Sequence, residues 1–186
     1  MNDVQLQGYG INNLSKEELI SIGSNNDLPK GPKILIVPGT GLGLSIFNNE
    51  KCIATEAGHL HIPSLSQKIN RILDHFEKEK ERKATFEDLL SGKGVSYIYA
   101  IYSQNIDHTY SNEEILSNVL NDKFCNETKN CLVEIFAYFA KYGALITGST
   151  GGVYLSGSLS ESLIKDDDFS KFKDIFVEST KMNKYL

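Results

Sequence analysis

Residues 34–64 read ILIVPGTGLGLSIFNNEKCIATEAGHLHIPS, and this stretch predicts a run of three strands. Its apolar and β-branched runs, bounded by glycine, proline and asparagine, indicate three strands, at 33–38, 44–48 and 52–55. The second and third strands are joined by a turn at Asn48-Asn49, and a glycine-rich segment separates the first two. We therefore expect strand, glycine loop, strand, turn and strand in one meander.

The glycine-rich segment has two possible interpretations. In a P-loop or a Rossmann turn the glycines open a helix, whereas strand-forming residues follow the glycines here. A Gly-Thr-Gly hairpin loop can instead form a nest of backbone amides, with a hydroxyl that donates to a phosphate oxygen. A plain β-turn explains the same residues, so the segment alone leaves both interpretations open.

The segment EAGHLH places Glu56 three residues before His59, with His61 two residues further on. These three side chains could hold a metal ion. A carboxylate beside an imidazole could equally bind neighbouring sugar hydroxyls, because together they offer several hydrogen-bond acceptors and a donor. An exposed surface turn is the third alternative.

Helical patterns surround this stretch on both sides. A short helix is expected in SKEELISIG, an amphipathic helix over 66–83, and another short helix in NEEILSNVL capped at Ser111 or Asn112. FEDLLSGKG predicts one or two helical turns halted by Gly92 and Gly94. A long buried helix is expected over 128–146, then a strand in VYLSG and a last helix in KFKDIFVESTKMNKYL. The apolar positions expected to be buried in the long helix are Leu132, Ile135, Phe136, Phe139 and Leu145.

Length and composition predict one folded domain. The chain has 186 residues, 40% of them hydrophobic, and its net charge is −5 without a clustered basic stripe. We therefore expect no nucleic-acid partner and no membrane partner. Cys52, Cys125 and Cys131 fit neither a disulfide framework nor a zinc pattern, so reduced, buried cysteines and a cytoplasmic location are expected.

Five motifs in order carry a resemblance to a known family. They are ND at 2–3, GTGLG at 39–43, E-x-G-H at 56–59, E-x-x-L-S-G-x-G at 87–94 and GGVYLSG at 151–157. Together they resemble the bacterial-type glucokinase family of the actin-like, hexokinase-like ATPase superfamily, over essentially the whole chain. The resemblance implies an α/β, ribonuclease H-like (actin/hexokinase ATPase) large domain, with a mixed sheet, flanking helices and one domain over residues 1–186.

The resemblance also implies a sugar site for glucose. Asp3 matches the general base toward the 6-hydroxyl of the sugar, and Asn2 matches an amide that contacts the sugar. Glu56 and His59 match a pair that holds sugar hydroxyls, and Glu87 matches a further sugar-binding carboxylate. Several carboxylates around one sugar suit the recognition of its hydroxyl stereochemistry, because a buried acceptor left unpaired is costly.

A nucleotide site for ATP with Mg²⁺ is implied in the same way. The matching residues are Gly39, Thr40, Gly41 and Gly43 for the second phosphate loop, and Gly151 and Gly152 for the adenosine-binding motif. The zinc-binding cysteine cluster of the related repressor-kinase family is absent, so no residue is assigned as a metal ligand.

The chain departs from the family pattern at both ends. It lacks the Asp-x-Gly-Gly-Thr motif of the small N-terminal domain and the closing strand and helix of the C-terminus. We therefore expect a partial or split glucokinase, active when a separate N-terminal half completes it. The alternative is an inactive remnant that binds sugar or nucleotide, or that forms a homodimer through the long apolar helix.

Overall fold

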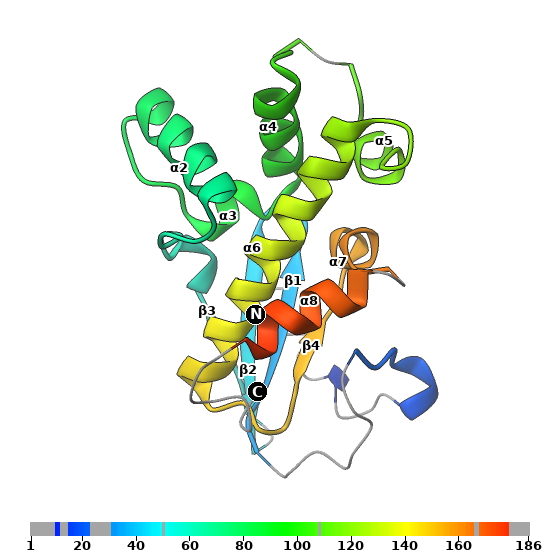
Figure 1. The fold of residues 1–186 in the computed structure, drawn as a ribbon. Helices are drawn as coiled ribbons and strands as arrows, with labels where there is room; N and C mark the ends of the chain where they lie inside the picture. Colours follow the sequence, from blue (N-terminus) through cyan, green and yellow to red (C-terminus); the bar gives the residue numbers. More distant parts are fainter. Residues whose placement is uncertain are drawn as a thin grey trace.

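A four-stranded mixed sheet lies at the centre of the residues that the computed structural model describes, which are 10–11, 15–22, 31–49, 51–107, 109–165 and 168–178 (Figure 1). Its strands are β1 (Lys33–Pro38), β2 (Leu42–Asn48), β3 (Lys51–Thr55) and β4 (Val153–Leu155). Their order is β3-β2-β1-β4; β1–β2 and β2–β3 are antiparallel, and β4 runs parallel to β1. The predicted meander is confirmed, and β2 begins two residues earlier than expected because Leu42 pairs with Pro38.

Helices flank this sheet. The described elements are η2 (Lys16–Glu18), η3 (Ala57–His59), α2 (Gln67–Lys80), α3 (Phe86–Leu89), α4 (Gly92–Ser103), α5 (Asn112–Ser117), α6 (Lys123–Thr147), α7 (Ser158–Leu163) and α8 (Asp168–Val177). Helix α6 packs on one face of the sheet, and α8 packs against α6 (Figure 1). Gly143 of α6 lies directly over Ile34 and Leu44, where an added Cβ would come within 3.1 Å of both side chains. The strands and helices together give the expected α/β arrangement.

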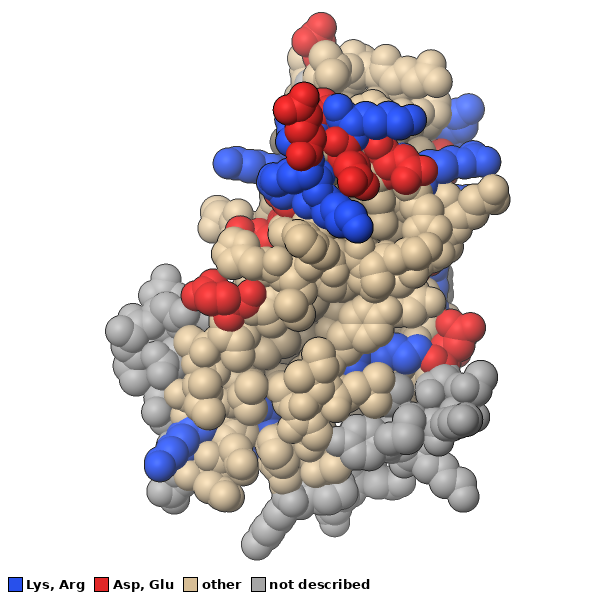
Figure 2. Space-filling view, turned by 90° about the vertical axis from the view of Figure 1, so that its left-hand side faces the viewer, with Lys and Arg blue, Asp and Glu red and all other residues tan. Residues whose placement is uncertain are grey.

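Several predicted helices are confirmed by their caps. Ser66 caps α2 through Ile69, and Ser111 caps α5 in a capping box with Glu114. Helix α2 buries Ile69, Ile72 and Phe76. The charged remainder of α2 lies in solvent, and Lys, Arg, Asp and Glu side chains mix in the upper part of Figure 2, at the level of α2 in Figure 1.

The long helix α6 starts earlier than its apolar pattern predicts. The Asp122 side chain accepts hydrogen bonds from the amides of Phe124 and Cys125, and this cap sets the first turn at Lys123. Four of the five expected apolar positions are at most 2% exposed, but Leu145 is 37% exposed, so its predicted burial is wrong. Leu145 lies in the last turn, past the point where Gly143 meets the sheet.

The helical turn expected in FEDLLSGKG is present as α3, which ends at Leu89, but the expected halt at Gly92 and Gly94 is wrong, because both glycines lie in the first turn of α4. An added Cβ on Gly94 would lie 2.1 Å from the carbonyl oxygen of Leu89, so the glycine lets the chain pass tightly from α3 into α4. Val95, Ile98 and Tyr99 then follow at helical spacing and are buried. Burial of this face favours the helix despite its glycines.

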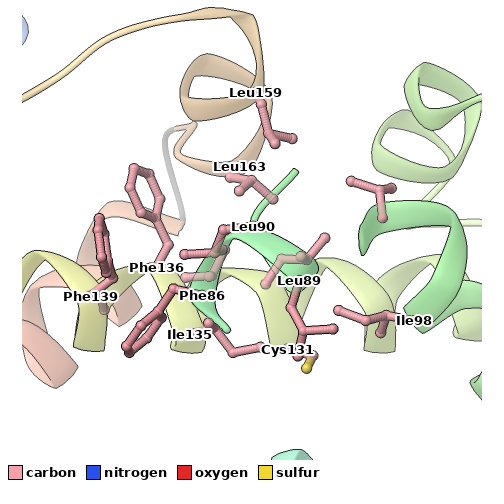
Figure 3. Packing of buried hydrophobic residues seen from close by; sticks show 14 of the residues in the cluster. Phe86, Leu89, Leu90, Ile98, Cys131, Ile135, Phe136, Phe139, Leu159 and Leu163 are labelled. Carbon is pink, nitrogen blue, oxygen red and sulfur yellow. The ribbon is translucent and has the colours of Figure 1, made fainter. Parts of the chain in front are cut away.

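Aromatic and aliphatic side chains from α3, α4, α6 and α7 meet in the core (Figure 3). The rings of Phe86 and Phe139 lie 4.9 Å apart between centroids, and both are at most 2% exposed. The three cysteines are free and buried, as expected, and burial raises the pKa of the Cys131 thiol to about 12. Within the described residues, no helix combines the length and the apolar character needed to cross a bilayer.

Candidate functional site

The glycine loop, residues 39–43, joins β1 to β2 at the carboxyl end of β1. It is tight: the amide of Gly39 donates to the carbonyl oxygen of Gly41 over 2.7 Å, and Thr40 is exposed between them. Gly43 already lies in β2, opposite Val37. A strand rather than a helix follows, so the loop differs from the P-loop and the Rossmann turn, as the sequence predicts.

Glu87 in α3 holds the glycine loop. Its Oε2 accepts a hydrogen bond of 2.9 Å from the amide of Leu42. An added Cβ on Gly41 would lie 2.8 Å from the same oxygen, so the carboxylate sits directly against the loop. The half-buried Glu87 side chain therefore joins the loop to α3.

A second contact ties the loop to α4. The amide of Gly92 donates to the carbonyl oxygen of Gly39 over 2.9 Å. The first turns of α3 and α4 thus both contact the loop, at Leu42 and at Gly39. This double attachment fixes the backbone of the loop relative to the Glu87 carboxylate.

The short helix α3 that carries Glu87 is itself well anchored. Thr85 and Asp88 form a capping box, and the Arg82 guanidinium binds Asp88 through two hydrogen bonds of 2.7 Å each. Partial burial opposes ionisation, yet Arg82 and Thr85 together lower the pKa of the Asp88 carboxyl to about 2. The amide of Phe86 also donates to Leu60. These contacts position a helix of one turn.

Glu56 and His59 lie just after β3, at the start and end of η3. Glu56 Oε2 and His59 Nε2 are 3.7 Å apart, and their side chains are 86% and 60% exposed. The buried Gly58 between them packs on Leu42, where an added Cβ would lie 2.4 Å from the Leu42 carbonyl oxygen. The Glu56–His59 pair is therefore fixed beside the residue that closes the glycine loop.

The metal interpretation of this segment needed His61 as a further ligand. The backbone of His61 pairs with that of Thr85 as an isolated β-bridge. Among the described residues, no group of three His, Cys, Asp or Glu side chains is close enough to hold a metal ion. The exposed carboxylate and imidazole remain suited to hydroxyl groups.

The structure thus brings most of the predicted site residues to one edge of the sheet. Strands β1 and β3 both end there, and β2 starts there. The residues at this edge are Gly39, Thr40, Gly41, Gly43, Glu56, His59 and Glu87. Asn2 and Asp3, predicted to bind the sugar and to act as the base, lie outside the described residues.

Gly151 and Gly152 lie at the other end of β1. Gly151 donates its amide to Pro32, and Gly152 accepts from the amide of Ile34, at the start of that strand. An added Cβ on Gly151 would lie 2.4 Å from the carbonyl oxygen of Gly31. The backbone of Gly151 is thus packed against another part of the chain, and the structure does not bring the two glycines to the loop. Their adenosine-binding role stays a prediction.

In the β4 region, Ser156 and Gly157 contact β1 toward the glycine-loop edge. The Ser156 amide donates to Ile36, and an added Cβ on Gly157 would lie 3.3 Å from the Pro38 carbonyl oxygen. Gly157 has φ +93°, a conformation that favours glycine. Ligands of open α/β sheets bind outside the carboxyl ends of strands. The second glycine cluster of the sequence, after VYL, was the available signal.

The family model described as Glucokinase matches residues 1–186. The chain belongs to the glucokinase family. Among curated glucokinases, that of Neisseria gonorrhoeae is 27% identical over 195 residues, and that of Campylobacter jejuni subsp. doylei is 30% identical over 198 residues. Each match covers 100% of this chain and 59% of the relative. The chain therefore spans less than two thirds of these glucokinases.

Solved structures agree on the fold. A glucokinase from an Antarctic psychrotroph superposes with a TM-score of 0.84 at 20% identity, covering 100% of this chain and 60% of that one. A glucokinase from Balamuthia mandrillaris, solved in complex with glucose, gives a TM-score of 0.73 at 19% identity, covering 85% of this chain and 48% of that one. The expected large-domain fold of the glucokinase family is confirmed.

Proposed function

We propose that this chain forms the glucose-binding and phosphate-binding part of a glucokinase, which transfers a phosphoryl group from ATP to the 6-hydroxyl of glucose. The observation that carries the proposal is the meeting of the glycine loop, the Glu56–His59 pair and Glu87 at one edge of the sheet. Because the chain spans 59% of its curated relatives, catalysis is proposed for the whole protein and ligand binding for this chain.

The geometry suits phosphoryl transfer to a sugar. This reaction requires the two substrates to be held in line, with donors placed at the transferred group and a carboxylate to accept the hydroxyl proton. Glu56 and His59 offer an exposed acceptor pair for hydroxyls, and the backbone of Gly39–Gly43 offers a place for phosphate oxygens. Asp3 is proposed as the base from its match to the family motif.

ATP and Mg²⁺ are assigned to the same edge of the sheet as glucose. ATP would place its phosphates at the glycine loop, and Gly157 is where its remainder could approach the backbone. Mg²⁺ is proposed as the companion of ATP, although the described residues offer no cluster of three ligand side chains for it. A separate N-terminal half, a homodimer and a cytoplasmic location remain predictions.

Calorimetric titration of the chain with glucose tests the proposal. We expect saturable binding that Glu56→Ala weakens at least about tenfold, because the variant removes hydrogen bonds to a charged acceptor. Glu77→Ala is the matched control, since Glu77 is an exposed glutamate on the remote helix α2. Equal glucose affinity in the Glu56→Ala variant, or no binding by a folded chain, would contradict the proposal.

A further inference from the structure

Thr55, the last residue of β3, links the Glu56–His59 pair to strand β2. Its hydroxyl donates a hydrogen bond of 2.8 Å to the carbonyl oxygen of Leu44 and accepts one of 3.3 Å from the amide of Ala57. Leu44 is also the residue that pairs with Thr55 across the two strands. One half-buried side chain therefore joins the start of η3 to the neighbouring strand.

The bond to Ala57 leaves the Glu56 carboxylate available to a ligand. A helix start has backbone amides without an intrahelical partner, and the N-cap side chain commonly accepts from one of them. Glu56 occupies the N-cap position of η3, but its carboxylate bonds to none of the described amides of that helix. Thr55 binds the Ala57 amide in its place, through the local side-chain to backbone bond that threonine favours. The Glu56 side chain is therefore 86% exposed, where a ligand can reach it.

Leu42 links the same pair to the glycine loop. This residue lies in the loop and is the first of β2. Its carbonyl oxygen lies against Gly58 of η3, where an added Cβ would collide with it. Its amide donates to Glu87 Oε2 of α3 over 2.9 Å. The residues proposed to bind the sugar, Glu56, His59 and Glu87, thus lie on the two elements that contact Leu42.

These links join the sugar side of the site to its phosphate side. A ligand that contacts both the Glu56–His59 pair and Glu87 holds η3 and α3 in one arrangement, and both elements contact Leu42. When the attachments of the loop are fixed in this way, a second ligand at the loop loses less conformational entropy on binding. Such coupling between two sites is reciprocal, so each ligand strengthens the binding of the other by the same factor.

We propose that Thr55 and Leu42 are positioning residues, which join the Glu56–His59 pair to the glycine loop so that glucose strengthens the binding of a nucleotide phosphate at the loop. Neither residue is proposed to touch the sugar. Their role rests on the proposed function, since glucose and ADP are the two ligands that it connects. The coupling arises within this chain, through β2, and requires no further segment of the protein.

Calorimetric titration of the chain with ADP, without glucose and with glucose at saturation, measures the coupling in the wild-type chain. We expect glucose to strengthen ADP binding at least about fivefold. Hydrogen exchange of the Leu42 amide, followed by NMR, should slow when glucose binds, because the Glu87 carboxylate that accepts from this amide becomes fixed. Equal ADP affinity with and without glucose would overturn the proposal, as would a chain that binds glucose but no ADP.

Thr55→Val, which keeps the shape of the side chain and removes the hydroxyl, tests the link. We expect glucose binding to weaken about three- to tenfold, and the effect of glucose on ADP affinity to disappear. ADP binding without glucose should stay within about twofold of the wild-type value, because the loop itself is unchanged. Thr55→Ser restores a hydroxyl and should restore most of the coupling. Wild-type glucose affinity and coupling in the Thr55→Val chain would overturn the role of Thr55.

Thr147 supplies the matched control. It is also half-buried, and its hydroxyl donates a hydrogen bond of 2.7 Å to the carbonyl oxygen of Gly143 and contacts the Ser149 hydroxyl. It ends α6, from which the chain runs to Gly151 at the amino end of β1, the end opposite the glycine loop. Thr147→Val should therefore leave the glucose affinity and the coupling unchanged. An equal loss of coupling in both valine variants would overturn the link, because the effect would then be one of stability alone.

Two outcomes distinguish the coupling from the proposed function. Glucose binding by the wild-type chain without any effect on ADP affinity overturns the coupling and leaves the proposed function standing. Absence of glucose binding by the folded wild-type chain removes the proposed function, and the coupling with it. Both outcomes come from the wild-type chain, so they do not depend on whether a variant folds.

Discussion

The two ends of strand β1 both carry glycines, but the space around these glycines differs. At the carboxyl end, an added Cβ on Gly39 would meet no atom within 4 Å. At the amino end, an added Cβ on Gly151 would lie 2.4 Å from the carbonyl oxygen of Gly31. Gly39 leaves the backbone open to a ligand, whereas Gly151 lets two segments of the chain pack. The role of a glycine therefore depends on the atoms that surround it in the fold.

The largest expected effect on stability is that of Gly151→Ala. The new methyl group would collide with backbone atoms of Gly31 and Pro32, which cannot move as a flexible side chain can. We expect the free energy of unfolding to fall by about 2–3 kcal/mol. Urea denaturation followed by circular dichroism measures this loss. A loss under about 0.5 kcal/mol would contradict the tight packing around Gly151 that distinguishes it from Gly39.

Glu87→Ala tests the attachment of the glycine loop. Removal of the carboxylate leaves the half-buried Leu42 amide without its acceptor, which we expect to cost about 1–3 kcal/mol of unfolding free energy. Hydrogen exchange of the Leu42 amide should accelerate in the same variant. Glu87→Gln keeps a carbonyl oxygen, so it should retain most of the protection. Unchanged exchange in Glu87→Ala would mean that the loop holds itself.

A pH effect should arise at Asp88, which anchors the helix that carries Glu87. The pKa of Asp88 is lowered from 3.8 to about 2 in the folded chain, so its stabilising effect is complete above pH 4 and is lost as the pH falls from about 4 to about 2. Because Arg82 is half-exposed, solvent screens its interaction with Asp88, and we expect this loss of unfolding free energy to be about 1–2 kcal/mol. Urea titrations at several pH values measure it. The Asp88→Asn variant should show a flatter dependence, and equal slopes would exclude Asp88 as the cause.

The smallest expected effect on stability is that of Gly39→Ala. Its Cβ would enter open space, so the free energy of unfolding should change by less than about 0.5 kcal/mol. Binding of ADP, measured by calorimetry, should nevertheless weaken, because the methyl group occupies space that a phosphate would approach. Unchanged ADP binding would show that the phosphates do not pass this side of the loop.

Local sequence patterns predicted those helices whose capping residue lies within one turn of the first buried apolar residues. Ser66 and Ser111 stand before apolar residues at helical spacing, and both cap helices in the structure. The start of α4 could not be predicted in this way, because Gly92 and Gly94 are poor helix formers. Packing of Gly94 on Leu89, which depends on the adjoining helix, overrides that preference.

The candidate site likewise has one part that short sequence motifs indicate and one part that depends on long-range contacts. Its Glu56–His59 pair and its glycine loop lie within 21 residues of each other, from 39 to 59, and one meander brings them together. The contribution of Glu87 to the loop depends on a hydrogen bond between residues 45 positions apart. The position of Gly151 depends on the parallel pairing of Ile34 with Val153. Neither long-range contact has a local signal.

The sequence by itself determined the family, the meander, the capped helices and the residue types of a sugar and phosphate site, because each of these is written in short motifs or in periodic burial. Only the tertiary structure decided which glycine cluster faces the site, and that Glu87 of α3 binds the glycine loop. The physical reason is that strand pairing and helix packing join segments far apart in the chain. Such contacts depend on the available space and on the hydrogen-bond partners of the folded chain.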